Sequence, residues 1–317
     1  MKNYAKLLMV STVFAVGLNA QTKDQMVKSI MDETYQNSQL ETLAYELLDG
    51  IGPRLVGSPK MQQAHDWAVK RFQNWGIDAR NEKWGEWKAW ERGPSSIEMT
   101  APYAKTIEGT QLAWSPATSS KGITADVLML PMFKNKEEFA AWLPKVKGKL
   151  VMVSQYQSSG RPEYNWKEFA TPESFEKMKK ETAESSEEWR KSIAATGETS
   201  RTLNEKLEKS GAVGIVSSNW SRGFGVNKIF SAGTKTIPVV DIALEDYGQL
   251  YRMIQHGTTP QLKINAQSKD KGTAPTFNTV AVIKGSQKPE EFVFYLHILI
   301  HGMEALAQPI TERERLR

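Results

Sequence analysis

The sequence predicts an α/β protein that begins with a helical segment. Between Gly122 and Gln267, short apolar segments with strand character alternate with helical segments, the order typical of a compact α/β domain. From Ser38 to Trp75, apolar residues recur at helical spacing instead. The 317 residues leave room for about two domains.

The first twenty residues have the pattern of a secretory signal. Lys2 and Lys6 supply positive charge, Leu7 to Leu18 is apolar, and Ala20 is a small residue before Gln21. A buried N-terminal helix is the alternative. The apolar stretch is short for a bilayer span, and no later segment is long and apolar enough. We therefore expect a secreted or periplasmic protein that leaves the membrane once residues 1–20 are removed.

The composition argues against several classes of function. There is no cysteine, which excludes disulfides and thiolate chemistry. The net charge is +5, and without Lys2 and Lys6 it is +3, from 39 basic and 36 acidic residues. These charges alternate in sign, as in KMKKETAESSEEWRK, and form no basic stripe, so nucleic acid is not an expected partner.

Two helices are predicted ahead of the first strand. Ser38 and Glu41 fit a capping box, and Gly50 suits the end of that helix. Its apolar positions are Leu40, Leu43, Ala44, Leu47 and Leu48. The second helix begins at Ser58-Pro59 and ends at Gly76. Its apolar positions are Met61, Ala64, Ala68, Phe72 and Trp75.

The loop IGPRLVGSP between these helices holds one charged residue, Arg54. Such a loop is either a rigid connector, which glycine and proline favour, or a contact for a ligand. A β-like segment, IDARNEKW, follows Gly76. Tryptophan is frequent here, at positions 67, 75, 84, 87 and 90. Exposed tryptophans could stack on sugar rings, whereas buried ones fill a core, which is their commoner use.

The predicted α/β domain contains strands at Ile123 to Leu130 and Gly148 to Val153, then a charged, helical and exposed stretch from Pro162 to Gly197. RTLNEKLEKSGAVGIVSS then predicts a helix and a strand, and IPVVDIALEDYGQLYRMIQHG a strand and a helix. Thr276 to Gly285 is a further strand, and Glu290 to Val293 begins another. The domain has no phosphate loop, nucleophile elbow or clustered metal ligands, which favours a binding or cover role.

Several segments together resemble the dizinc exopeptidases, most closely the carboxypeptidase Q (plasma glutamate carboxypeptidase) group. They are IGPRLVGS, WERG, GITADVLML, GAVGIVSS, IPVVDIALED and FNTVAVIKGSQKPEEFV, in this order along the chain. The resemblance implies that residues 21–121 are the N-terminal part of a metallopeptidase and that residues 122–267 form its protease-associated (PA) domain. Residues 275–293 would be the first strands of an α/β catalytic domain.

In that family, two zinc ions share a bridging water that attacks the peptide bond of a short peptide or dipeptide, because metals lower the pKa of water and polarise the carbonyl. The resemblance implies an H-x-D motif just after the strand begun by Glu290 to Val293, and then a D-N-G-x-G motif. Neither motif stands in this chain. We therefore expect no catalytic residue, metal ligand or bound zinc in the sequence as written.

Residues 294–317, FYLHILIHGMEALAQPITERERLR, differ in character from the rest. Read one nucleotide earlier, their codons permit LSAHFDSWDGGTGATDNGTGT, which contains both missing motifs. This compatibility suggests a one-base frameshift near Val293. His297 and His301 stand four residues apart, as zinc ligands on a helix do, but the sequence lacks a third ligand beside them. His65 and His256 are interpreted as surface or packing residues.

Three functions remain open. The first is a secreted zinc exopeptidase that is truncated and inactive as written. The second is a non-catalytic module that binds a peptide or protein through residues 122–267. The third is a sugar-binding surface built on the tryptophans. The oligomeric state and the substrate preference are not predicted by the sequence.

Overall fold

The structure is a computed structural model that describes residues 23–229 and 231–295. The predicted signal segment, His297 and His301 lie outside the described residues. The chain divides into two units, Met1–Gly50 and Ile51–Arg317, which are treated separately. None of the described helices has the length and apolar character needed to cross a bilayer.

The first unit is helical. It contains α1 (Lys23–Gln36), α2 (Leu40–Ala44) and most of the π-helix η1 (Tyr45–Ile51). The predicted capping box is wrong, because Gln39 and not Ser38 is the N-cap of α2; the Ser38 hydroxyl accepts a hydrogen bond from the Leu40 N–H at 3.4 Å. The helical segment also extends one residue beyond its predicted end at Gly50, since η1 continues to Ile51. Neither α1 nor α2 has a buried residue.

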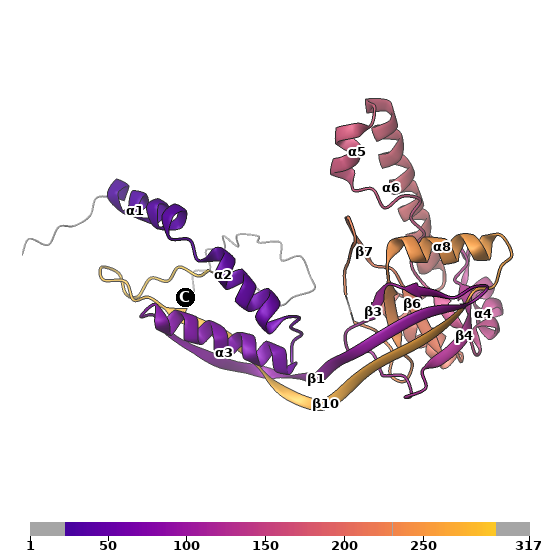
Figure 1. The fold of residues 1–317 in the computed structure, drawn as a ribbon, viewed down its shortest axis with the longest axis horizontal. Coiled ribbons are helices and arrows are strands. Elements are labelled where there is room, and N and C mark those ends of the chain that lie inside the picture. The colour runs from indigo at the N-terminus through magenta and orange to yellow at the C-terminus, as the bar shows by residue number, and fades with distance from the viewer. Residues whose placement is uncertain (1–22, 230, 296–317) are drawn as a thin grey trace, which may run out of the picture. The chain divides into compact units, whose positions relative to one another are not determined.

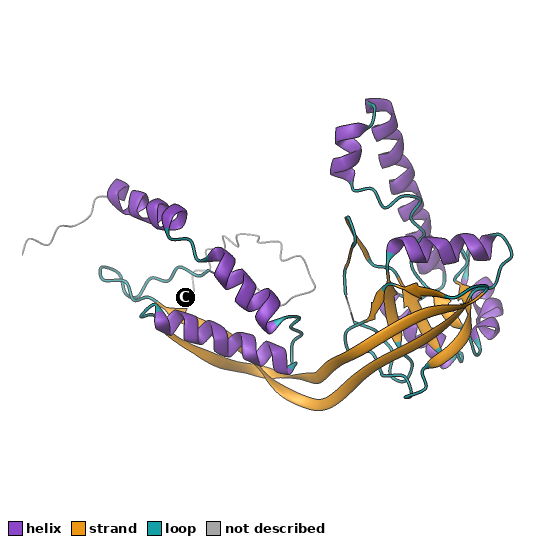
Figure 2. Ribbon diagram, viewed as in Figure 1, coloured by secondary structure: helices purple, strands orange, loops and turns teal. Residues whose placement is uncertain are grey.

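The second unit contains the remaining elements (Figures 1 and 2). Its helices are α3 (Pro59–Asn74), α4 (Lys136–Trp142), the 3₁₀ turn η2 (Leu143–Val146), α5 (Glu163–Phe169), α6 (Pro172–Ala195), α7 (Ser200–Lys209) and α8 (Leu244–Gln255). Its strands are β1 (Asp78–Ala101), β2 (Lys105–Ile107), β3 (Gly109–Gln111), β4 (Ile123–Met129), β5 (Leu150–Met152), β6 (Gly214–Ser217), β7 (Trp220–Gly223), β8 (Val226–Asn227), β9 (Val239–Ile242) and β10 (Gln261–Val282).

The α/β prediction is confirmed. Eight strands form one sheet in the order β2-β1-β10-β4-β5-β6-β9-β3, and β4, β5, β6 and β9 run parallel. On one face, Tyr247 and Leu250 of α8 pack with Ile97, Met99 and Leu262. On the other face, α4, η2 and α7 pack against Val151 of β5, Ile215 of β6 and Val239 of β9. We call residues 95–268 the α/β body.

The two longest strands, β1 and β10, pair antiparallel from Asp78↔Val282 to Ala101↔Gln261. We call this pair the ribbon; Figure 1 shows it running from α3 to the α/β body. The strand predicted at Thr276 to Gly285 is therefore the second half of β10 and ends at Val282. The strand predicted to begin at Glu290 is wrong, because described residues 283–295 contain only turns and irregular backbone.

Helix α3 packs on the part of the ribbon that lies outside the α/β body. Ser58 caps it as predicted, because the Ser58 hydroxyl accepts a hydrogen bond from the Met61 N–H at 3.2 Å. Met61, Ala64 and Ala68 are buried as predicted. Trp75 is instead the C-cap and is 46% exposed, so it does not belong to the buried face.

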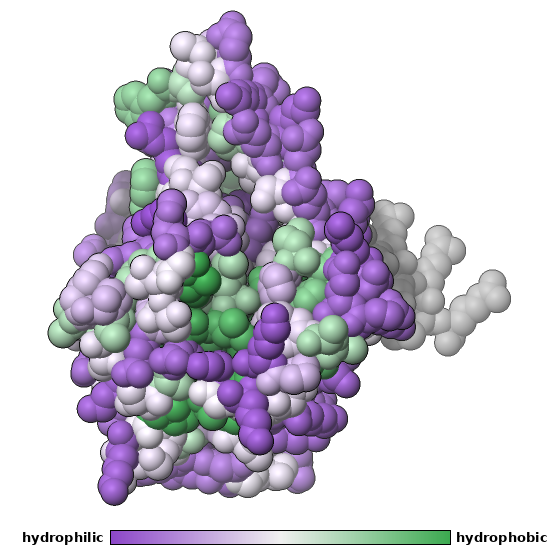
Figure 3. Space-filling view, turned by 90° about the vertical axis from the view of Figure 1, so that its right-hand side faces the viewer, coloured by the Kyte–Doolittle hydropathy of each residue, from purple (hydrophilic) through white to green (hydrophobic). Residues whose placement is uncertain are grey.

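The charged stretch from Pro162 to Gly197 forms α5 and α6, and its predicted exposure is confirmed, since Ser192 is the one buried residue of α6. Ion pairs such as Lys177–Glu181 and Lys180–Glu184 run along α6. Figure 3 shows this helical projection mostly hydrophilic, with hydrophobic residues gathered near the centre of the face below it. The mixed charge thus serves as a solvated surface.

Candidate functional site

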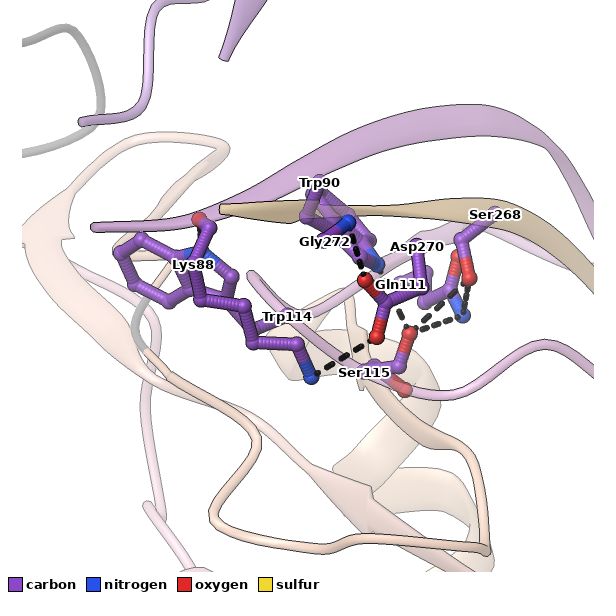
Figure 4. Close-up of polar contacts among 8 residues, drawn as sticks. All are labelled: Lys88, Trp90, Gln111, Trp114, Ser115, Ser268, Asp270 and Gly272. Carbon is purple, nitrogen blue, oxygen red and sulfur yellow. Dashed lines mark hydrogen bonds and ion pairs between the residues drawn. The ribbon is translucent and has the colours of Figure 1, made fainter. Parts of the chain in front are cut away.

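The ribbon meets the α/β body at Trp90. This side chain is 3% exposed, and its Nε1 donates a hydrogen bond to the Ser115 carbonyl at 3.0 Å. The same carbonyl accepts hydrogen bonds from Gln111 Nε2 at 3.2 Å and Ser268 Oγ at 3.0 Å (Figure 4). Three donors from β1, β3 and β10 therefore converge on one acceptor and fix the ribbon against the body.

Trp114 precedes this carbonyl and has a strained backbone. Its φ is +56°, a conformation that bulky residues rarely adopt and that is found at ligand-binding sites. The indole Nε1 donates to the Lys88 carbonyl at 3.1 Å, and the ring lies 6.5 Å from that of Trp87. Because the Trp114 indole N–H already donates to this carbonyl, the Trp114 ring offers its face and edge rather than a donor.

The rim of this junction is charged. Lys88 Nζ lies 3.7 Å from an Asp270 carboxylate oxygen, and the other oxygen accepts a hydrogen bond from the Gly272 N–H at 2.8 Å (Figure 4). Trp87 is 46% exposed and Trp84 is 54% exposed. The prediction that the tryptophans fill a core is therefore correct for Trp90 and wrong for these two.

Arg92 lies two residues beyond Trp90, with its guanidinium carbon 5.4 Å from the centre of the Trp90 ring. Its Nε and Nη2 atoms are buried and have no hydrogen-bond partner. Burial lowers the pKa of Arg92. A guanidinium remains charged in proteins, so this side chain is a shielded cation with two donor atoms that lack an acceptor.

A second polar cluster lies where the parallel strands of the body end. The Asp241 carboxylate on β9 accepts hydrogen bonds from the Ser217 hydroxyl, from the Asn219 N–H and side-chain amide, and from the Asn227 amide, at 2.6 to 2.9 Å. Asp241 is 2% exposed, and burial raises its pKa while these hydrogen bonds lower it. Since both carboxylate oxygens are occupied, this cluster fixes the β7–β8 hairpin to the sheet.

Arg54, in the loop between η1 and α3, is 2% exposed, and its Nη1 donates to the Gly52 carbonyl at 2.7 Å. Gly57 of the same loop has a φ of +77°, and a Cβ there would lie 2.9 Å from the Lys88 carbonyl. The loop backbone thus approaches the ribbon closely. These contacts favour the interpretation of IGPRLVGSP as a connector.

His65 connects α3 to the ribbon. Its Nδ1 lies 2.9 Å from the Thr279 hydroxyl, and the imidazole is buried, as the packing interpretation predicted. Burial lowers the pKa of His65, while Asp66 raises it less. The pKa of His65 is therefore lower in the folded protein than in the unfolded chain. The contribution of neutral His65 to stability is present above the ordinary histidine pKa and is lost as pH falls through the pKa of the folded state.

We therefore expect α3 to loosen on the ribbon as pH falls below about 6.5, the ordinary histidine pKa. Amide hydrogen exchange of α3, compared between pH 7.5 and 5.5, measures this. His65→Gln should remove the pH dependence, and His256→Gln, on an exposed residue, should leave it intact. An unchanged pH dependence in His65→Gln would refute this assignment.

The described residues do not fit a zinc site. Within residues 23–229 and 231–295, no group of three or more His, Cys, Asp or Glu side chains could hold a metal ion. Such a group is what a structural or catalytic zinc site requires. The junction and the Asp241 cluster were both missed by the sequence analysis, because their members are scattered from Lys88 to Gly272.

Comparison with known proteins places this fold. Human carboxypeptidase Q is 27% identical over 261 residues, which cover 81% of this chain. The Xenopus laevis protein of the same name is 25% identical and covers 84% of this chain. The chain is related to carboxypeptidase Q. The resemblance to the dizinc exopeptidases that the sequence predicted is thereby confirmed.

The carboxypeptidase Q relatives are longer than this chain, which spans about half of their length, 48% for the human protein. Among solved structures, the peptidase M28 precursor from Shewanella amazonensis is similar with a TM-score of 0.56 and 20% identity. The match covers 84% of this chain and 55% of that one, and it supports the α/β fold. No protein-family profile matches the chain.

Proposed function

We propose that this chain is the N-terminal part of an exported zinc-dependent exopeptidase that acts on short peptides, and that it hydrolyses none by itself. The similarity to carboxypeptidase Q over 81% of the chain, but over 48% of the human protein, is the observation that carries the proposal. Export rests on the signal-like residues 1–20. The division into residues 21–121, a PA-like domain at 122–267 and a catalytic beginning at 275–293 belongs to the same proposal.

The proposed inactivity rests on the sequence, in which neither the H-x-D nor the D-N-G-x-G motif of the family is present. Residues 294–317 support a lesion in the reading frame, because their codons permit both metal-binding motifs of the family one nucleotide earlier. Resequencing the gene across the codons for Gly285 to Arg317 tests this directly. A confirmed frame with no ligands beyond it would leave a binding function as the alternative.

Peptide hydrolysis provides the biochemical test. We expect the purified 317-residue chain with added zinc to release no amino acid from dipeptides above the rate of a zinc-only blank. If resequencing restores a longer frame, its product should hydrolyse the same peptides and lose this activity with a chelator. Chelator-sensitive hydrolysis by the 317-residue chain itself would overturn the proposed inactivity.

A non-catalytic binding module is the second candidate. The observations that favour it are the strained backbone of Trp114, the half-exposed Trp87, and the two unpaired nitrogens of Arg92 further along β1. Peptide binding by the zinc-free chain would support this function. Quenching of tryptophan fluorescence by oligosaccharides, but not by peptides, would favour the sugar-binding surface instead.

A further inference from the structure

Arg92 is held in place by an irregular part of the ribbon. The pairing of β1 with β10 shifts register between Ala89 and Trp90 and again between Arg92 and Ser95. Such bulges re-aim side chains and are frequent next to binding sites. At Gly93 the strands lie so close that a Cβ would be 2.9 Å from the Gln267 carbonyl. The backbone is thus fixed at the position from which the Arg92 side chain extends.

The two orphaned atoms of Arg92, Nε and Nη2, form one edge of the guanidinium. Their N–H groups point in parallel, the geometry that binds both oxygens of one carboxylate. A buried charged donor without an acceptor is strongly unfavourable, so binding of an acceptor to this edge would be stabilising. The Trp90 ring shields the cation at 5.4 Å and supplies a cation–π contact.

The described acidic residues nearest to this edge along the ribbon are engaged elsewhere. Asp270, opposite Trp90, pairs with Lys88 at 3.7 Å and accepts from the Gly272 N–H. Glu91 pairs with Lys271 at 3.3 Å. Within the described part of the chain, no acceptor therefore reaches the Arg92 edge.

Gln111, beside Ser268, has an unpaired buried oxygen, Oε1. Its amide nitrogen is held by the Ser115 and Pro116 carbonyls at 3.2 and 2.7 Å, so the amide cannot be turned over without losing both hydrogen bonds. Ser268 is the cross-strand neighbour of Arg92. The junction thus combines two unpaired cationic donors with a fixed unpaired acceptor.

We propose that Arg92 binds the free α-carboxylate of a peptide. The choice of a peptide as ligand rests on the proposed function. Because Nε and Nη2 are buried, binding requires the Arg92 side chain to shift, while the backbone at Gly93 stays in place. The donor pair accounts for recognition of a carboxylate rather than an amide.

The test uses the complete chain and two matched probes, N-acetyl-phenylalanine and N-acetyl-phenylalaninamide. The Nε–H NMR signal of Arg92, assigned with Arg92→Lys, should shift saturably with the acid, and the amide should bind at least about tenfold more weakly. Arg92→Gln should abolish binding of the acid. Arg80→Gln, which removes an exposed arginine of the same strand, should bind normally.

Equal binding of acid and amide, or no binding of either to the unmodified chain, overturns the proposal without any variant. A change in the Arg92 Nε–H signal of the ligand-free chain caused by Asp270→Asn would show that an internal carboxylate already occupies the edge, which also overturns it. Neither readout depends on hydrolysis or zinc. Failure here is thus distinguishable from failure of the proposed peptidase origin.

Discussion

A fragment of residues 122–267 is expected not to fold, whereas a fragment of residues 88–272 should fold cooperatively. The shorter fragment lacks four buried side chains of the body, Ile97, Met99, Ile107 and Leu112, each at most 3% exposed. Complete burial of one such side chain contributes about 1.5–3 kcal/mol. The loss of about 6–12 kcal/mol is comparable to the whole stability of a typical domain, about 5–15 kcal/mol.

The strand pairing also predicts that the shorter fragment does not fold. β10 lies between β1 and β4, so removing β1 exposes one edge of β10. Leu262 and Ile264 of this strand, which are fully buried in the intact protein, would then become exposed. Circular dichroism, thermal unfolding and amide NMR dispersion of both fragments provide the measurement. A sharp thermal transition of the 122–267 fragment, close in midpoint to that of the longer one, would contradict the expectation.

Asp241→Ala is expected to destabilise the α/β body by about 1–3 kcal/mol, the cost of leaving buried hydrogen-bond donors without their acceptor. The substitution leaves donors of Ser217, Asn219 and Asn227 without their acceptor. Urea unfolding measures the loss. Asp126→Ala is the matched control, because Asp126 is a partly exposed surface partner of Lys149 at 2.7 Å and should cost less than about 1 kcal/mol.

The pH dependence of Asp241 has a defined sign. Burial raises the pKa of Asp241 in the folded state, so the folded protein holds this proton more tightly than the unfolded chain. Its contribution is therefore most favourable at low pH and is lost as pH rises through the folded value. The unmodified chain should therefore lose stability relative to Asp241→Asn as the pH rises from 4 to 7. A flat difference would refute the assignment.

The local elements were predictable because their signals are local. Ser58-Pro59 marks the start of α3, and the apolar runs at Ile123 and Gly148 mark β4 and β5. Where prediction failed, tertiary context decided. Glu290 to Val293 has strand composition, but the described structure gives this segment no neighbouring strand, and a strand needs one for its hydrogen bonds. Trp75 and Trp87 lie at a helix end and on the ribbon, where each is 46% exposed.

The sequence by itself determined the α/β class, the positions of α3, β4 and β5, and the relation to carboxypeptidase Q, because periodicity and short motifs lie in consecutive residues. Only the tertiary structure decided that β1 and β10 form one ribbon and that Trp90, Gln111 and Ser268 share the Ser115 carbonyl. It also decided that the Arg92 edge lacks an acceptor. Several of these contacts join residues far apart in the chain, such as Arg92 with Ser268 and Ser115 with Ser268, and such contacts have no period or spacing in the sequence.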